Sequence, residues 1–378
     1  ISPTPPDYAA LAVRTNSGPS IARVIDSLNA FELQVLEAMM VLEEPIKVKE
    51  LEKITDTAAR FAYKKFEELA LVYEGVIPTQ VRESIGAEPA GLGPRSLAKI
   101  DLKKLATAPD SAKKVMSALC WGPPRGSVGD IKNPGPGIAW LLEHHFVVPL
   151  DQRHVVMPAE VAIHLRGGKV HKELASNAPE LQGKKYNQSD VDRAAIANIS
   201  NVLRWCEEIL NFWGETAPTA LRAGGLGVRD LKDAAQHLGV SEGCAAFVAE
   251  LCYLSGLVAI DADETIAPTN SFDIWLTQDF ESKWRNIVSL WLITSRVSGL
   301  VGRSEQKFSA LGPELDRVSA ANIRSRVLEE LRSNIELSPS IISFTERMKW
   351  LAPLRRGANL RDDLVKWTLE ETEWLGMS

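Results

Sequence analysis

FVVPLDQRHVVMP at Phe146–Pro158 and LVAIDADETIAP at Leu257–Pro268 share one pattern, from which we predict the fold. In each stretch an apolar run leads to an aspartate, and a proline follows that aspartate by seven positions. Short runs of β-branched residues on either side of a polar turn are typical of β-hairpins. The sequence therefore predicts a hairpin unit that occurs more than once.

Each predicted hairpin directly follows a segment with helical character, GIAWLLEHH before the first and SEGCAAFVAELCYLSG before the second. In the second segment, Ser241 is a suitable N-cap and Gly256 a suitable stop. Because a lone hairpin is marginally stable in water, each must pack on its own helices. Helices followed by a small hairpin outline a winged helix. We therefore predict a mainly α protein with small β-hairpin wings, built from tandem winged-helix (helix-turn-helix) modules.

A similar module is predicted near the start of the chain. In NAFELQVLEAMMVLEE, Asn29 and Glu32 have the spacing of a capping box. A later helix, DTAARFAYKKFEELALVYEG, is expected to turn Phe61 and Phe66 toward a core and to expose Tyr63. The run LVYEGVIP then closes the unit with a rudimentary strand pair.

The chain of 378 residues is long enough for two or three domains, or for more if the units are small. The hairpins and the polar stretches between them place the boundaries. The predicted organisation is a winged-helix-like module over 20–80, a winged-helix module over 95–168, a polar linker over 169–198, a winged-helix module over 199–298, and a helical, winged-helix-like module without a clear wing over 319–378.

Signatures of enzymes are missing from the sequence. It contains no GxxxxGK[ST] phosphate loop and no HExxH or GxSxG motif. The Gly-rich AGGLGVRD at Ala223–Asp230 has no phosphate-binding lysine, and we interpret it as a tight turn that enters a helix. His144 and His145 are adjacent and point to different helix faces, so they are poor joint metal ligands. We predict a non-catalytic protein with no cofactor, no metal and no small-molecule substrate.

The cysteines and the apolar runs indicate the compartment. Cys120, Cys206, Cys244 and Cys252 form no CxxC pair, which predicts buried, reduced thiols in a cytoplasmic, nucleoid-associated protein. No apolar run reaches the roughly 18 residues of a membrane span, and the start lacks the order of a secretory signal. The sequence does not begin with Met, which suggests a processed or trimmed piece of a longer chain.

Any binding of nucleic acid must depend on local basic patches, because the net charge of the chain is −6 and its pI is about 5.7. Residues 95–132 hold eight bases against three acids, and residues 347–366 hold six against two. Such patches can neutralise phosphates, although ordinary solvated faces have the same composition.

Double-stranded DNA is the partner that these patches favour. In the first module Arg60, Tyr63 and Lys64 lie three and four positions apart, so they are expected to share a face. Arginine can pair with guanine edges, and lysine and tyrosine can reach phosphates. A basic helical surface without a ligand is the alternative. The predicted DNA-binding residues are Arg60, Tyr63, Lys64, Lys65, Lys113, Lys114, Arg125, Lys132, Arg222, Arg229, Arg355 and Arg356.

The third module differs in charge, because residues 241–281 hold eight acidic residues and no lysine or arginine. A helix and wing this acidic should be repelled by phosphates, so this module is expected to pack on another domain or a protein. Only its entry turn, with Arg222 and Arg229, can contact phosphate. The alternative function is therefore a protein-interaction scaffold whose winged helices bind a helicase, a polymerase or a chromosome-organising partner.

Three strings together carry a resemblance: WGPPRG at Trp121–Gly126, PAEVAIHLRGG at Pro158–Gly168 and LRAGGLGVRDL at Leu221–Leu231. They resemble the helicase-associated proteins of actinobacteria, which are similar to the region outside the motor of XPB-type DNA helicases. The resemblance implies tandem winged-helix modules, a role in DNA repair or transcription, and a DNA helicase as a protein partner. It implies no catalytic residues. The leading prediction is a non-catalytic DNA-binding accessory protein.

Overall fold

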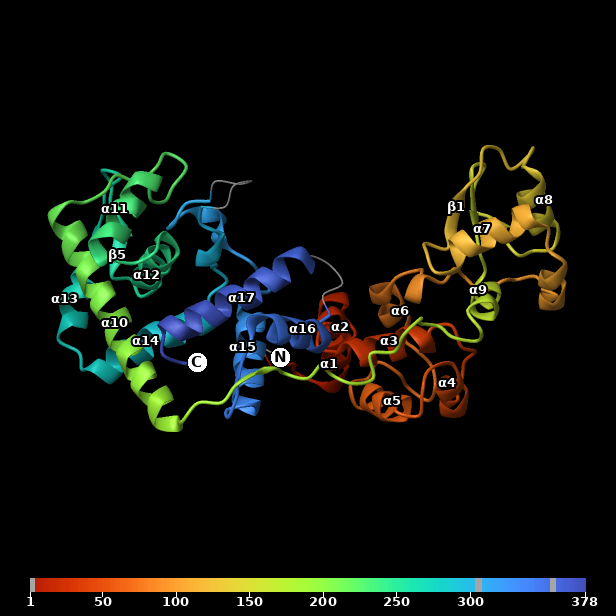
Figure 1. Ribbon diagram of the computed structural model, residues 1–378, viewed down its shortest axis with the longest axis horizontal. Helices are drawn as coiled ribbons and strands as arrows, with labels where there is room; N and C mark the ends of the chain where they lie inside the picture. Colours follow the sequence, from red (N-terminus) through yellow and green to blue (C-terminus); the bar gives the residue numbers. More distant parts are fainter. Residues whose placement is uncertain (1–3, 303–307, 354–357) are drawn as a thin grey trace. The chain divides into compact units, whose positions relative to one another are not determined.

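The structure is a computed structural model that describes residues 4–302, 308–353 and 358–378 (Figure 1). With 56% helix and 7% strand, it confirms the mainly α class with small antiparallel sheets. The chain divides into two compact units. The first comprises Ile1–Ala178 with Lys349–Arg355, and the second comprises Pro179–Met348 with Arg356–Ser378. Within the described ranges, no helix has both the length and the apolar character that crossing a bilayer requires.

Short helices dominate the first unit. They are α1 (Tyr8–Thr15), α2 (Gly18–Ile25), α3 (Ala30–Met39), α4 (Val48–Ile54), α5 (Ala59–Glu68), α6 (Thr79–Ile85), α7 (Asp110–Cys120), α8 (Pro136–Glu143) and α9 (Ala159–Leu165), with 3-10 turns η1 (Pro89–Gly91) and η2 (Leu102–Thr107). Its sheet consists of β1 (Arg125–Ser127), β2 (Val148–Pro149) and β3 (His154–Val156). The strand order is β1-β3-β2, and all pairs are antiparallel.

Longer helices build the second unit. They are α10 (Gln188–Glu215), α11 (Val228–Leu238), α12 (Glu242–Leu254), α13 (Asn270–Leu276), α14 (Phe280–Ile293), α15 (Ala320–Ser333), α16 (Ile341–Leu351), which runs into the first unit, and α17 (Ala358–Trp374), with 3-10 turns η3 (Ser298–Leu300) and η4 (Pro313–Leu315). Its strands are β4 (Gly183–Lys184), β5 (Val258–Ile260), β6 (Ile266–Pro268) and β7 (Ser338–Pro339); β5 pairs with β6 and β4 with β7.

One arrangement occurs three times along the chain: a helix, a short extended segment, one or two helices, and a hairpin. In the second occurrence, β1 bonds to the second hairpin strand, β3. In the third, Thr219 forms a bridge with Thr265, next to β6. In the first, Tyr73 and Val76 form the hairpin, and Ile46 N donates to Gly75 O at 2.8 Å. Both predicted hairpins are therefore present, each with a further segment alongside.

The helix boundaries expected from capping residues are also confirmed. Asn29 Oδ1 accepts from Glu32 N at 2.9 Å, and Glu32 Oε2 accepts from Asn29 N at 3.0 Å, which completes a capping box. Ser241 caps α12 by accepting from Cys244 N. Gly256 follows the end of α12 with φ +67°, a conformation that glycine adopts without steric cost.

The predicted linker over 169–198 is wrong at both ends. Val170 is fully buried in the first core, and Ala175 N donates to Gln34 Oε1 at 2.8 Å. From Gln188 onward the chain is helical. The first turns of α10 are largely exposed, so they lack the apolar stripe by which a helix is recognised in a sequence. Local side-chain pairs such as Arg193 with Asp190 support them instead.

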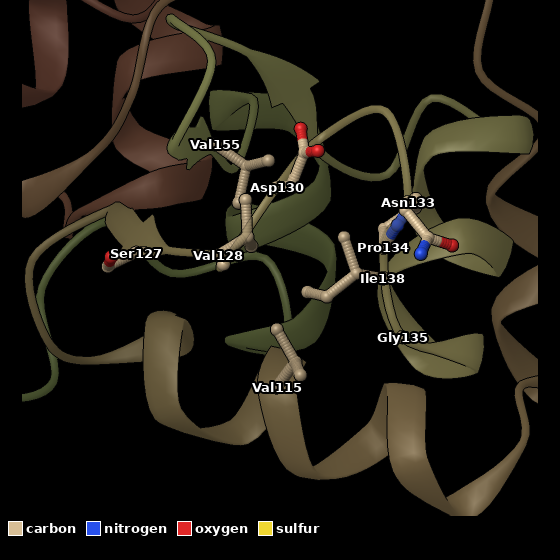
Figure 2. Close-up of a pocket in the computed structure, with 11 residues that line it drawn as sticks. Val115, Ser127, Val128, Asp130, Asn133, Pro134, Gly135, Ile138 and Val155 are labelled. Atoms are coloured by element: carbon tan, nitrogen blue, oxygen red, sulfur yellow. The ribbon is translucent and has the colours of Figure 1, made fainter.

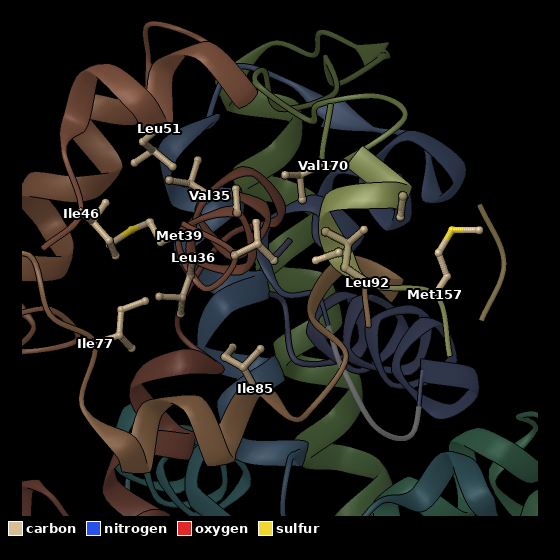
Figure 3. Packing of buried hydrophobic residues seen from close by; sticks show 14 of the residues in the cluster. Val35, Leu36, Met39, Ile46, Leu51, Ile77, Ile85, Leu92, Met157 and Val170 are labelled. Carbon is tan, nitrogen blue, oxygen red and sulfur yellow. The ribbon is translucent and has the colours of Figure 1, made fainter. Parts of the chain in front are cut away.

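The predicted modules at 20–80 and 95–168 share one hydrophobic core (Figure 3). Val35 and Leu36 of α3 belong to the same cluster as Leu92 and Met157. Gly93 allows the close approach, because a Cβ there would lie only 2.3 Å from Met157 O. The two modules therefore form a single unit.

The end of the module predicted over 319–378 packs into the core of the second unit. Leu375 is fully buried in the cluster that also holds Phe247 of α12 and Trp213 of α10. The ring of Trp374 lies 5.3 Å from that of Phe247. Trp374 and Leu375 therefore contribute to the core of the unit that contains the second hairpin.

All four cysteines are buried and unpaired, as expected. Burial raises the pKa of the Cys244 thiol to about 12, and it also raises the pKa of Cys252, which lies beside Cys206. Only the thiolate reacts readily. Native protein at pH 8 is therefore expected to react with a chromogenic disulfide reagent far more slowly than unfolded protein, in which all four thiols should react. Rapid labelling of the native chain would contradict this burial.

Candidate nucleic-acid interface

The exposed face of α5 differs from the predicted set of Arg60, Tyr63 and Lys64. Tyr63 is only 8% exposed, whereas Phe61 is 72% exposed, so the expected positions of these two rings are wrong. The buried stripe of α5 begins at Ala59 and continues through Ala62, Tyr63 and Phe66. These residues follow Ala59 by three, four and seven positions, which is the regular spacing of one helical face. Phe61 does not belong to this buried face. Burial also raises the pKa of Tyr63.

Two cations remain on the outer face of α5. Arg60 is exposed, and its Nε lies 2.9 Å from Glu52 Oε1. Lys64, one turn further, is exposed and has no ion-pair partner among the described residues. Lys65 instead donates to Glu32 Oε1 at 2.7 Å, next to the capping box of α3. The basic surface of α5 is therefore its N-terminal half, which also exposes Phe61.

The cations predicted around α7 and β1 are exposed, but two of them already have a carboxylate partner. Lys113 Nζ lies 3.5 Å from Asp110, and Arg125 pairs with Glu88. Lys114 is exposed and unpaired in the part of the chain that the structure describes. The intrahelical pair is weak at the surface, so Lys113 can exchange Asp110 for a phosphate at small cost.

The turn of the first hairpin brings a further arginine into this region. Val128 N donates to Arg153 O at 2.7 Å, and Ile131 N donates to Gln152 O at 3.1 Å. These bonds place the segment that bears Lys132 alongside the hairpin turn. We call Lys132 and Arg153 the hairpin-turn cations; both are exposed. Arg153 escaped the sequence prediction, which counted runs of basic residues rather than positions in a turn.

Asp151 orders this turn. It accepts from Arg153 N at 2.7 Å and from His154 N at 2.8 Å, and its other oxygen lies 2.8 Å from His154 Nδ1. The bond from Arg153 N and the contact with His154 hold the pKa of this carboxyl below its ordinary value. The aspartate shared by both repeats is therefore a turn-forming residue.

A pocket of about 350 Å³ lies between β1 and the start of α8 (Figure 2). Val115, Val128 and Ile138 surround it, and Asp130 and Asn133 add polar groups at its edge. Its lining holds one carboxylate, that of Asp130, and one side-chain hydroxyl, that of Ser127, but no histidine or lysine that could activate the hydroxyl. The lining therefore offers shape and apolar surface rather than a catalytic pair.

The remaining predicted cations lie in the second unit or outside the described residues. Arg222 is exposed in the turn before α11, and Arg229 is exposed on α11, 4.0 Å from Asp233. AGGLGVRD forms the expected tight turn, in which Gly225 has φ +90°. Arg355 and Arg356 fall outside the described residues.

The helix before the second hairpin, α12, cannot enter a groove, because the protein itself covers it. All residues from Cys244 to Cys252 are buried. Glu250 accepts from Arg296 Nε and from Leu311 N, both at 2.6 Å, so the segment after η3 is fixed against the helix. Access to this helix would require the loss of a buried ion pair.

No family model, curated protein or solved structure matches this chain. Within residues 4–302, 308–353 and 358–378, no group of three or more His, Cys, Asp or Glu side chains is placed to hold a metal ion.

Proposed function

We propose that this chain is a non-catalytic accessory protein that binds double-stranded DNA through its first unit. The three repeated arrangements are winged-helix modules in this proposal. The order of helices and strands supports it, as does the β1-β3-β2 order, because the first strand borders the second strand of the hairpin in such a module. In this proposal the α5 helix takes the position of the recognition helix in the first module, and the hairpin turn at Asp151 takes that of the wing in the second.

One observation carries the proposal: the α5 helix, last before its hairpin, exposes Arg60 and Lys64 one turn apart on its outer face. A helix in this position fits the major groove, where arginine reads guanine and lysine neutralises phosphate. Breaking the exposed Arg60–Glu52 pair costs little, since surface pairs contribute at most about 1 kcal/mol. The hairpin-turn cations Lys132 and Arg153 add phosphate contacts from the neighbouring module.

The resemblance to helicase-associated proteins extends this proposal to DNA repair or transcription, to a location at the nucleoid, and to a DNA helicase as a protein partner. The second candidate function is a protein-interaction scaffold. Its specific support is the second unit, where α12 is buried and the exposed residues of the hairpin and of α13 carry carboxylates instead of cations.

Removal of the two α5 cations tests DNA binding. In fluorescence anisotropy with random-sequence duplex DNA, the Arg60→Ala/Lys64→Ala variant is expected to bind about tenfold more weakly at low salt. The slope of log K against log[salt] should become shallower by about 1, because Lys64 is the member of the pair that contacts phosphate and roughly one counterion is released per phosphate contact.

A variant with the same change in charge serves as the control. Arg204→Ala/Arg285→Ala removes two exposed cations from helices of the second unit and should leave duplex affinity unchanged. Undetectable binding of the unmodified chain at low salt, or an equal loss in both variants, would refute the proposed interface.

A further inference from the structure

Phe61 is the one large apolar side chain of α5 that the fold leaves in solvent. Of the ten phenylalanines of the chain it is the most exposed, at 72%, and Phe280 follows at 51%. Its ring is outside the hydrophobic cluster of the first unit and has no ring contact within the described ranges. Single exposed apolar residues are common, so the position of Phe61 on the helix decides what it can do.

The N-terminal half of α5 carries Phe61 together with the two cations of the proposed interface. Phe61 follows Arg60 directly and precedes Lys64 by three positions, so the ring and the Lys64 side chain are neighbours on the helix surface. The C-terminal half has the opposite charge, because Glu67 and Glu68 are exposed there. The acidic end repels a phosphate backbone, which leaves the half that bears Phe61 as the part of α5 that meets a duplex.

A phenyl ring that enters the major groove finds one apolar group that distinguishes the bases, the C5-methyl group of thymine. The other groups that distinguish the base edges are hydrogen-bond donors and acceptors. A ring that covers such a group removes its water without replacing the hydrogen bond, which is unfavourable. In a recognition helix, the residues near the N-terminus contact the base edges. Phe61, the third residue of α5, has this position.

We infer that Phe61 is a specificity-determining residue that recognises thymine through its C5-methyl group. This inference rests on the proposed binding of duplex DNA by the first unit. It goes beyond that function, because a phosphate contact such as that of Lys64 positions the protein but carries no sequence information. The preferred ligand is therefore a duplex that contains A·T pairs, and its affinity depends on the thymine methyl group rather than on the hydrogen bonds of the base pair.

Uracil in place of thymine tests this inference, because it removes the methyl group and keeps every hydrogen-bonding group of the base. Two labelled duplexes of the same mixed sequence, made only of A·T pairs or only of A·U pairs, are compared by fluorescence anisotropy at low salt. The unmodified chain is expected to bind the thymine duplex about fourfold more tightly, the change in affinity for burial of one methyl-sized group. With Phe61→Ala the two affinities should become equal, whereas Phe61→Leu, which keeps an apolar side chain, should retain a preference for thymine.

Phe280→Ala is the matched control, because Phe280 is the second most exposed phenylalanine and belongs to the second unit. It should preserve the preference for thymine, and circular dichroism should stay unchanged in all variants, since both rings are exposed. Equal affinity of the unmodified chain for the two duplexes, a preference that survives in Phe61→Ala, or its loss in the control would each overturn the inference and leave DNA binding itself intact. If the unmodified chain binds neither duplex, the proposed function is refuted, and the role of Phe61 is refuted with it.

Discussion

Replacement of Glu371 with alanine is expected to lower the free energy of unfolding of the second unit by about 3–5 kcal/mol, because it leaves a buried charge unpaired. Glu371 and Arg324 are each 3% exposed. The carboxylate of Glu371 accepts from Trp291 Nε1 at 2.7 Å and from Ser298 Oγ at 2.8 Å. Arg324 Nε lies 3.5 Å from it. The substitution therefore removes a partner from three buried groups, and Arg324 keeps only its bonds to the carbonyl oxygens of Thr294 and Arg296.

The neighbouring glutamate provides a matched control. Glu370 lies one position earlier on α17, is partly exposed, and faces Lys366 at 3.9 Å. Glu370→Ala should change stability by less than about 1 kcal/mol. Glu371→Gln should fall between the two, because an amide oxygen still accepts hydrogen bonds but carries no charge. Denaturant unfolding followed by tryptophan fluorescence checks all three variants, and equal stability of the Glu371 and Glu370 alanine variants would contradict this account.

Replacement of Arg166 with methionine is expected to destabilise the first unit by a similar amount, about 3–5 kcal/mol, since each buried polar group left without a partner costs about 1–3 kcal/mol. Arg166 is 6% exposed, and it bonds to backbone carbonyls instead of a carboxylate. Its guanidinium donates to Cys120 O at 2.6 Å, Val170 O at 2.7 Å, Ala90 O at 3.2 Å and Gly91 O at 3.2 Å. One side chain therefore joins α7, η1 and the segment after α9.

The shape of the guanidinium makes Arg166 hard to replace. A lysine has three donors on one atom and cannot span carbonyls on three segments, so Arg166→Lys should not restore stability. Arg95→Met is the control, because Arg95 is exposed and its bonds to Glu43 and Glu160 are surface pairs. Hydrogen exchange should show faster exchange in α7 and α9 for Arg166→Met alone, and unchanged protection would count against this role.

Local sequence patterns predicted a structural feature correctly wherever the residues that specify it lie within a few positions of one another. The capping box at Asn29, the N-cap at Ser241 and both hairpins were correctly predicted, because each depends on neighbours along the chain. The residues of the proposed DNA interface were harder to predict from the sequence. The prediction for Tyr63 was wrong, since apolar runs on a short helix fit more than one face until a core selects one.

The sequence by itself determined the helical class, the two hairpins and the acidic character of residues 241–281, since composition and short-range pattern specify these properties. Which cations are free of an ion pair, and so can contact a phosphate, depends on the tertiary structure. Lys65 is paired with Glu32, far away in the sequence, whereas Lys64 beside it is unpaired among the described residues. It also decided that α12 is buried and that Arg166 binds carbonyls. Each of these outcomes depends on partners that only folding brings within hydrogen-bonding distance, and no local pattern encodes them.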